Sequence, residues 1–432
     1  MELLHILILV GSFAFLLFIG VPISFSIGIS TIVTMLLSIE AGPALTTVAQ
    51  RMATGLDSFA LLAIPFFILS GQLMNRGGIA RRLIDFAKAL VGMFPGGLAF
   101  VNIMAAMLFG SISGSAVASS AAIGGFMVPM MKKEGYDLNY SAAVNITSAT
   151  TGLIIPPSNI LIVYSLASGG VSIGALFVAG YLPGILIGIM LMMVAGVIAY
   201  RKKYPVSQRI ELKDGILRFL NALPSLFLVV LVIGGIVAGY FTATEASAIA
   251  VLYTFILSVL IYREVKWKEL PKILLDSTAT TAIVMLLVGA SMAMSWVISY
   301  ENIPQNVSAA LIEISNSRII ILLIINIMLL LVGTFMDMTP AVLIFTPIFL
   351  PVVIQLGVDP VHFGIIMVLN LCIGLCTPPV GSVLFIGCGI AGTSIAKVVK
   401  PLLPLFIAML VSLLLITFIP QISLFLPRLF GY

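Results

Sequence analysis

Long apolar runs, separated by short polar or charged stretches, recur from one end of the chain to the other. Many have roughly the 20 residues that an α-helix needs to cross the hydrocarbon core of a bilayer. The first begins at Leu3 and continues past a Gly20-Val21-Pro22 break to about Ile39. It is too long for a signal peptide and has no basic start, so we expect it in the mature protein. The pattern predicts an all-α polytopic membrane protein.

Composition agrees with this prediction and excludes several functions. Of the 432 residues, 61% are hydrophobic and 9% are charged, whereas a soluble domain has about 25% charged residues. There is no nucleotide-binding loop, nucleophile elbow or zinc-protease motif. Cys372, Cys376 and Cys388 lie in apolar context, which predicts buried thiols rather than a disulfide or metal framework. We expect no enzyme, no ATP-driven pump, no organic cofactor and no nucleic-acid partner.

Basic residues lie in clusters between the apolar runs, and 18 of the 21 lysines and arginines belong to five such clusters. The clusters are Arg76, Arg81, Arg82 and Lys88; Lys132 and Lys133; Arg201, Lys202, Lys203, Arg209, Lys213 and Arg218; Arg263, Lys266, Lys268 and Lys272; and Lys397 and Lys400. Cytoplasmic loops of membrane proteins are enriched in lysine and arginine. We therefore expect all five clusters on the cytoplasmic side.

The charges predict a re-entrant helical hairpin over residues 90–131. Two short apolar pieces, 92–109 and 116–131, lie between two cytoplasmic clusters and meet at a small polar tip, residues 110–115. Two full spans are the alternative, but each piece is short for one. Non-helical backbone at membrane depth is tolerated where protein or a wet cavity surrounds it.

A second hairpin, over residues 319–356, is predicted to enter from the periplasmic side. A span of about 276–300 leads there from the fourth basic cluster, and the pieces 319–333 and 341–356 then meet at residues 333–340. The flanks lack a basic cluster.

Each hairpin is followed by an apolar run that tandem prolines interrupt. Pro156-Pro157 lies within 140–165, and Pro378-Pro379 lies within 361–388. Such prolines break a helix because they remove backbone hydrogen bonds. The two runs therefore predict two broken transmembrane helices. Gly110 and Pro156 are 46 positions apart, and Gly333 and Pro378 are 45 apart.

The matching order and opposite charge flanks predict an inverted repeat. Residues 1–200 form the first repeat and 221–432 the second, and the basic and apolar stretch 201–220 is expected to be a cytoplasmic amphipathic linker helix. The N-terminus is expected in the cytoplasm and the C-terminus in the periplasm. Two short sequences, at Asp57-Ser58 and at Thr242 to Glu245, are typical of helix N-caps.

Interrupted helices at matching places in inverted halves are typical of a substrate and ion site in a secondary transporter. Asp337 is the only acidic residue between Glu313 and Asp359 and lies at the second tip. A charge at membrane depth is costly, which favours a functional role over an ordinary loop aspartate. A carboxylate with hydroxyl and carbonyl oxygens suits sodium, and helix N-termini suit an anionic substrate.

The chain resembles the large membrane subunit, of DctM type, of tripartite ATP-independent periplasmic (TRAP) transporters. The motifs that carry the resemblance are DSFALLAIPFF at 57–67, SGSA at 113–116, IPPS at 155–158, TEA at 244–246, MDMTP at 336–340 and TPPVG at 377–381. They occur in this order over essentially the whole length.

This resemblance implies a multi-pass bacterial inner-membrane importer with an elevator-type, ion-transporter-like fold and sodium (Na⁺) as the coupling ion. It also implies a separate small four-helix membrane subunit of DctQ type and a periplasmic substrate-binding protein of DctP type. The substrate would be a small organic anion: a C4-dicarboxylate, a keto acid or a sugar acid such as sialic acid.

The resemblance also implies site residues. The first sodium site would comprise Ser113, Gly114, Ser115, Gly152, Ile155 and Pro156. The second would comprise Thr334, Asp337, Thr339, Cys376, Thr377 and Gly381. Substrate contacts would come from Ser158, Asn159 and Ser382. Neither tip carries an arginine, the usual partner of a carboxylate.

Two other functions fit the same pattern. One is a self-sufficient sodium/dicarboxylate symporter of similar two-hairpin design, and the other is a channel or assembly subunit without coupled transport.

Overall fold

The computed structural model describes residues 2–205, 212–315, 317–378 and 381–432, and all regular structure within them is helical. The first half contains α1 (Glu2–Phe18), α2 (Ile23–Ser38), α3 (Ala41–Leu56), α4 (Ala63–Arg76), α5 (Ile79–Val91), α6 (Gly97–Ser113), α7 (Ala116–Lys133), α8 (Leu138–Ala149), α9 (Asn159–Ala167) and α10 (Ile173–Lys202). The second contains α11 (Leu212–Val237), α12 (Ala243–Phe255), α13 (Leu270–Tyr300), α14 (Ile303–Ile314), α15 (Arg318–Phe335), α16 (Met338–Gln355), α17 (Pro360–Gly374), α18 (Ser382–Ala391), α19 (Ile395–Phe418) and α20 (Gln421–Leu429).

The order of elements in the first half recurs in the second. Each half has two helices joined at a glycine with positive φ, Gly20 or Gly239. A long spanning segment follows, formed by α3 and α4 or by α13. A short helix, a hairpin, an interrupted pair and a long helix then follow in each half, and α20 comes after them in the second. The order of elements thus recurs along the chain, whereas the inversion of the two halves stays a prediction.

The predicted linker helix differs from the structure. Helix α10 continues to Lys202, and α11 begins at Leu212 and runs to Val237 without interruption. Residues 212–220 are therefore the first turns of a long apolar helix rather than a separate surface helix. Residues 206–211, in the middle of the expected linker, lie outside the described residues.

The two hairpins are α6–α7 and α15–α16, with turns shorter than the polar tips in the sequence. Helix α6 ends at Ser113 and is followed by Gly114, whose φ of 60° lies in the left-handed region. Ser115 then caps α7, where its side chain accepts a hydrogen bond from the Ala118 backbone N–H at 3.2 Å. Residues 110–113 are therefore helical, and only 114–115 form the turn.

Both proline-containing runs are interrupted, as predicted. Helix α8 ends at Ala149, a short 3-10 segment (Thr151–Leu153) follows, and α9 begins only at Asn159, after the cis peptide bond between Pro156 and Pro157. Helix α17 ends at Gly374, and α18 begins at Ser382. Pro379 and Val380 lie outside the described residues.

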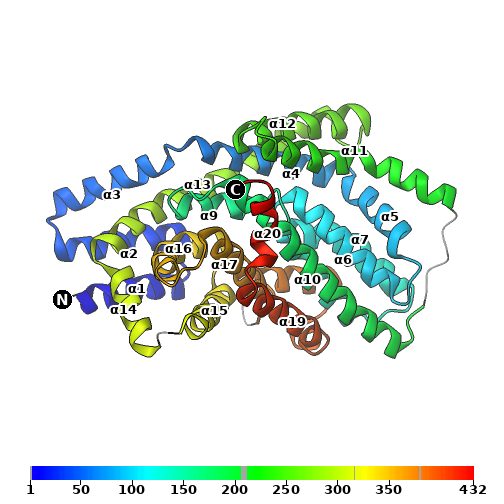
Figure 1. The fold of residues 1–432 in the computed structure, drawn as a ribbon. Helices are drawn as coiled ribbons and strands as arrows, with labels where there is room; N and C mark the ends of the chain where they lie inside the picture. Colours follow the sequence, from blue (N-terminus) through cyan, green and yellow to red (C-terminus); the bar gives the residue numbers. More distant parts are fainter. Residues whose placement is uncertain (1, 206–211, 316, 379–380) are drawn as a thin grey trace.

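The hairpins and broken helices of both halves form a single core, here called the hairpin body (α6–α10 and α15–α19). The halves are intertwined, because α7 packs against α18 and α16 packs against α9. The core between them contains large, fully buried side chains such as Tyr164, Phe177 and Phe363. In Figure 1 this body extends from α15 and α16, left of centre, to α6, α7 and α10 on the right.

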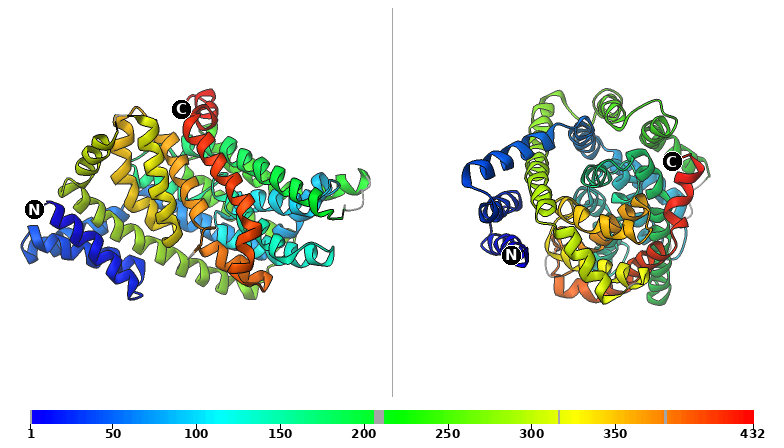
Figure 2. Two further views of the ribbon diagram at one scale, coloured as in Figure 1. Left: turned by 90° about the horizontal axis from the view of Figure 1, so that it is seen from below. Right: turned by 60° about the vertical axis from the view of Figure 1, so that its left-hand side comes forward.

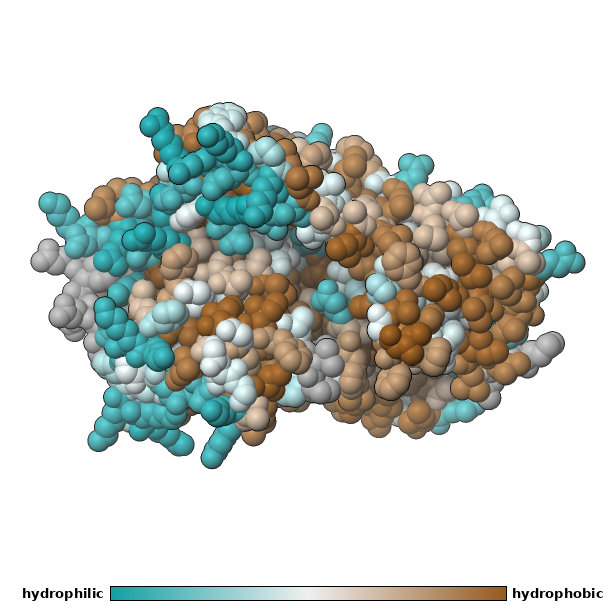
Figure 3. Space-filling view, turned by 180° about the vertical axis from the view of Figure 1, so that it is seen from behind, coloured by the Kyte–Doolittle hydropathy of each residue, from teal (hydrophilic) through white to brown (hydrophobic). Residues whose placement is uncertain are grey.

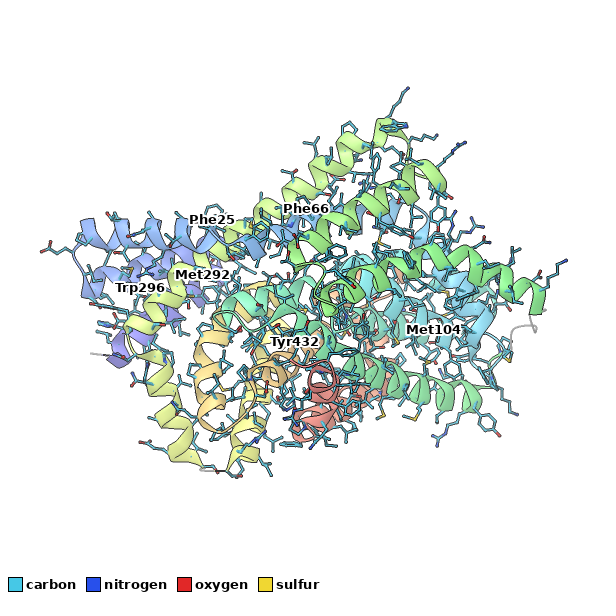
Figure 4. The ribbon with its side chains drawn as sticks, turned by 45° about the horizontal axis from the view of Figure 1, so that its top comes forward. Phe25, Phe66, Met104, Met292, Trp296 and Tyr432 are labelled. Atoms are coloured by element: carbon cyan, nitrogen blue, oxygen red, sulfur yellow. The ribbon has the colours of Figure 1, made fainter. Side chains whose placement is uncertain are left out.

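The remaining long helices, α1–α4 and α11–α13, form a second group, here called the scaffold. Helix α4 packs against α12, and α13 packs against α2 and α3. In the right-hand view of Figure 2, α13 lies between α1–α3 and the hairpin body. Met292 and Trp296, labelled in Figure 4, lie on α13 beside these N-terminal helices, and the Arg51 guanidinium is 5.4 Å from the Trp296 ring centroid.

The surface agrees with a membrane protein. Among the described residues, eight helices are long and apolar enough to cross a bilayer, including both arms of the second hairpin. Length alone therefore allows these arms to span, and their re-entry stays a prediction from charge. Figure 3 shows a broad apolar surface at one end of the molecule and hydrophilic side chains at the other.

A polar cluster joins α1, α2 and α13 and bears on the side of the membrane predicted for the N-terminus. The His5 Nδ1 atom is 2.6 Å from the Glu301 carboxylate, and the Ser38 hydroxyl donates to Glu301 at 2.7 Å. Glu301 follows α13, whose other end adjoins the fourth basic cluster. A 31-residue helix is about 46 Å long. Under the charge rule this neighbourhood favours a periplasmic start of α1, because α1 and α2 fold back on each other at Gly20, and the side on which the N-terminus lies stays a prediction.

Cysteine labelling of intact cells tests this orientation. A membrane-impermeant maleimide should modify Leu4→Cys and Arg318→Cys from outside, because both positions belong to the face without basic clusters. Lys132→Cys and Lys203→Cys should react only after permeabilisation. The natural cysteines are buried and give a low background. Modification of Leu4→Cys only after permeabilisation would restore a cytoplasmic N-terminus.

Candidate functional site

A cavity of about 200 Å³ lies where the two hairpin tips meet the broken helices and the scaffold. The tips contribute Gly114, Ser115, Asp337 and Thr339, the broken helices Asn159, Leu375 and Ser382, and the scaffold Ile64, Ile68, Thr280 and Val284. Residues from both halves of the chain are therefore needed to enclose it.

Four helices begin at this cavity. The first residues of α7, α9, α16 and α18 all line it: Ala116, Asn159, Met338 and Ser382. The N-terminus of a helix carries a partial positive charge and backbone N–H groups without intrahelical partners. The cavity is therefore suited to an anion even without a lysine or arginine.

Asp337 is the only charged residue among the described residues that line the cavity. It is exposed and precedes α16, but its side chain makes no capping hydrogen bond. No ion pair to it is present in the described part of the chain. The equivalent position in the first hairpin is Ser115, whose hydroxyl caps α7. The carboxylate of Asp337 is thus free to bind a cation.

In each half, one pair of glycines lets the hairpin pack closely against the broken helix. A Cβ atom added to Gly152 would lie 2.3 Å from the Cα atom of Gly110. One added to Gly374 would lie 2.5 Å from the Cα atom of Gly333. Backbones approach this closely only where neither residue has a side chain. The two contacts fix the tips beside the interruptions.

Buried polar side chains strengthen the same two contacts. The Ser148 hydroxyl of α8 donates to Asn102 Oδ1 of α6 at 3.2 Å. In the second half, Asn370 Nδ2 of α17 donates to Asn326 Oδ1 of α15 at 2.8 Å. A buried polar group without a partner is destabilising, so each pair favours one arrangement of hairpin and helix. Sequence reasoning missed these four residues, because single polar residues in apolar helices carry no motif.

Comparison with known proteins identifies the family. The model of the DctM component of tripartite ATP-independent periplasmic transporters matches residues 10–422. The chain belongs to this family.

Relatives of known name extend along nearly the whole chain. A Pseudomonas aeruginosa C4-dicarboxylate TRAP transporter large permease protein is 41% identical, over 94% of each chain. A Vibrio cholerae sialic acid TRAP transporter large permease protein is 37% identical, over 96% of this chain and 97% of the relative. An Oleidesulfovibrio alaskensis isethionate TRAP transporter permease protein is 40% identical, over 97% of this chain but 66% of the relative.

Solved structures support the fold alone. The Alcanivorax borkumensis YdaH transporter aligns with a TM-score of 0.64 at 13% identity, covering 92% of this chain and 90% of its own. Neisseria gonorrhoeae MtrF, described as an antimetabolite efflux pump, aligns with a TM-score of 0.61 at 13% identity, covering 87% and 84%. The all-helical transporter fold is thus confirmed.

The structure places six of the predicted site residues of this DctM-family chain around the cavity. They are Gly114, Ser115, Asn159, Asp337, Thr339 and Ser382. The Ser382 hydroxyl has no hydrogen-bond partner within the described residues. Sequence reasoning missed the scaffold wall, where Thr280 on α13 lies in no recognised motif.

The other predicted residues are not among those that line the cavity. Ser158 is fully buried, and its hydroxyl donates to the Leu153 carbonyl at 2.5 Å, so its side chain supports the break rather than lining the cavity. Thr334 and Thr377 donate to carbonyls one turn earlier in their own helices, at 2.7 and 2.8 Å. These hydroxyl oxygens keep lone pairs for a cation.

The remaining predicted site residues are in close contact with neighbouring residues. Ser113 donates to the Ser115 carbonyl at 3.5 Å. The Cys376 thiol donates to the Ile146 carbonyl at 3.4 Å. Ile155 and Pro156 pack on α10, where glycines leave room for them. A Cβ atom on Gly381 would lie 2.7 Å from the Leu375 carbonyl oxygen. Gly152, Ile155, Pro156 and Gly381 could therefore offer backbone carbonyls only.

Substitution of the paired glycines tests how the site is held. Gly152→Ala should lower the stability of the protein by about 1–3 kcal/mol, because the added methyl group meets backbone rather than a movable side chain. The midpoint of thermal unfolding in detergent measures this. Gly125→Ala in α7, with no atom within 4 Å of the added carbon, is the control. Equal midpoints for the two variants would contradict the close contact.

Proposed function

We propose that this chain is the large permease subunit of a sodium-coupled TRAP importer of a small organic anion. The observation that carries the proposal is the cavity in which one unpaired carboxylate, Asp337, faces four helix N-termini. A single site thus offers a negative group for a cation and positive helix ends for an anion. Such adjacency suits co-transport of the two, as midplane sites of secondary transporters require.

Sodium is the cation proposed. Sodium prefers oxygen ligands, and Asp337 and Thr339 bring a carboxylate and a hydroxyl to the cavity. The carbonyls released at the breaks after α8 and α17 supply further oxygens.

The proposed substrate class follows from the relatives and from the cavity. The names of the relatives specify a C4-dicarboxylate, isethionate, 2,3-diketo-L-gulonate and sialic acid, which all carry an acidic group. In this chain the acid would bind at the helix N-termini. The Asn159 amide and the unpartnered Ser382 hydroxyl would provide directed hydrogen bonds.

The same geometry suits an elevator mechanism. The cavity lies between the hairpin body and the scaffold wall formed by α4 and α13. Sliding of the hairpin body along this wall would carry the site between the two faces. We place the protein in the inner membrane with both termini in the periplasm. A small membrane subunit and a periplasmic binding protein complete the tripartite system; the isethionate relative bears the name DctMQ.

Sodium dependence is testable in proteoliposomes that contain the chain and its two partners. An inward sodium gradient should drive uptake of the binding protein's ligand without ATP. Replacing sodium with potassium should abolish uptake, because the larger ion does not fit the same oxygens. Equal uptake in potassium would exclude sodium coupling. Uptake without the binding protein would favour a self-sufficient symporter, and current without a saturable substrate would favour a channel.

Asp337→Asn tests the cation site. Loss of the carboxylate charge should raise the sodium concentration for half-maximal uptake at least about tenfold, which corresponds to about 1.4 kcal/mol of lost binding free energy. Asp214→Asn, an exposed position at the start of α11, is the matched control and should leave this value unchanged. An unchanged sodium requirement in Asp337→Asn would place the residue outside the site.

A further inference from the structure

A second cavity, of about 420 Å³, shares no lining residue with the first, and most of the residues that line it are charged or polar. It opens between α5, the first turns of α11 and the loop that follows α12. Its lining includes Arg81, Arg82 and Arg218 with Asp85, Tyr262 and Glu264. Three of the five basic clusters contribute to it or adjoin it, so the charge rule places it at the cytoplasmic surface.

The three arginines differ in how they are held. Arg82 donates to the Gly78 carbonyl at 2.9 Å, and its guanidinium lies 3.6 Å from the centroid of the Tyr262 ring. Its Nη2 atom is 3.9 Å from Glu264. Arg81 and Arg218 have no ion-pair partner in the described part of the chain. Two guanidinium groups are therefore available to an incoming anion.

The surroundings of this cavity are apolar and face outward. Leu220 lines it and is exposed, as is Leu217 on the adjoining turn of α11. Leu260 and Ile261 are also exposed, at the end of the π-helical turn (Ile256–Ile261) that continues α12. A charged pocket that borders lipid-facing side chains suits a molecule with a polar head and apolar chains. Basic pockets between transmembrane helices on the cytoplasmic side bind phospholipid head groups.

Charge and hydrogen bonding limit which lipid head groups fit the cavity. Three guanidinium groups and two carboxylates leave the lining with a surplus of one positive charge, which matches the single negative charge of a phosphodiester. Asp85 and Glu264 accept hydrogen bonds but donate none. A head group with hydroxyl donors satisfies them, whereas a trimethylammonium group has no donor.

We propose that the Arg81–Arg218 cavity binds the phosphate of an anionic glycerophospholipid whose head group carries hydroxyls, such as phosphatidylglycerol. The bound phosphate joins α5 to α11, which already touch through Phe86 and Phe219, with ring centroids 5.6 Å apart. Helix α5 connects α4 of the scaffold to the first hairpin. A lipid bound between α5 and α11 therefore fixes α5 to the scaffold. This proposal is independent of sodium coupling and of the transported substrate.

Thermal unfolding of the full, delipidated chain in detergent tests the site. Phosphatidylglycerol should raise the unfolding midpoint of the wild type, and phosphatidylcholine at the same concentration should not. R81Q/R218Q should lose at least half of the increase. The matched control K88Q/K213Q removes the same charge from the same two helices outside the cavity and should keep the full increase.

Several outcomes would overturn the proposal. One is equal stabilisation of R81Q/R218Q and the control by phosphatidylglycerol. Another is equal stabilisation by phosphatidylcholine, which would indicate general lipid solvation. Equal stabilisation by inorganic phosphate would indicate a site for free anions. If the double variant does not fold, Arg218→Gln alone, compared with Lys213→Gln by native mass spectrometry of bound phosphatidylglycerol, gives the same decision.

Discussion

Backbone polar groups inside a bilayer must find partners within the protein, and this requirement governs the architecture around Asp337. Two transmembrane helices are interrupted, and two hairpins end beside the interruptions. Every interruption frees N–H and C=O groups that lipid cannot satisfy. The chain places both interruptions beside one cavity and surrounds that cavity with both of its halves. The groups that would be destabilising in lipid become the lining of a polar cavity.

This arrangement depends on close packing where side chains are absent. Gly110 with Gly152 and Gly333 with Gly374 bring backbone against backbone. The buried pairs Ser148–Asn102 and Asn370–Asn326 then add a directed hydrogen bond to each contact. Small residues are favoured between membrane helices because lipid provides no hydrophobic drive for their association. The position of each hairpin against its broken helix is therefore set by close backbone packing and by a buried polar pair.

Much of the fold could be predicted from the sequence because its signals are physical and local. The prolines at 156–157 and 378–379, the glycines at 110 and 333 and the basic clusters led to the interruptions and the hairpins. The helix N-cap predicted at Thr242 to Glu245 is confirmed, and in the structure Thr242 and Glu245 form a capping box there. Asp57 was not, because it ends α3, and the Ser58 side chain caps nothing.

The features that could not be predicted depend on contacts between residues far apart in the chain. The sequence shows a break at Gly20 but not that the chain reverses there, which the packing of α1 against α2 and the contact between His5 and Glu301 reveal. The choice of Asn159 and Ser382, rather than Ser158, as cavity residues depends on which way a side chain points after a break. The scaffold wall with Thr280 has no local signal, because it becomes part of the site only through packing of α13.

The exchange of helices between the two halves has a consequence for how the protein is made. Helix α7 rests on α18 and α9 on α16, so neither half can complete its own core. During synthesis, which proceeds from the N-terminus at about 5–20 residues per second, α7 and α9 enter the membrane well before Ser382 leaves the ribosome. For that interval the first hairpin and the first broken helix have no partner for their inner faces. The insertion machinery or nearby lipids must cover these inner faces until the second half has been inserted.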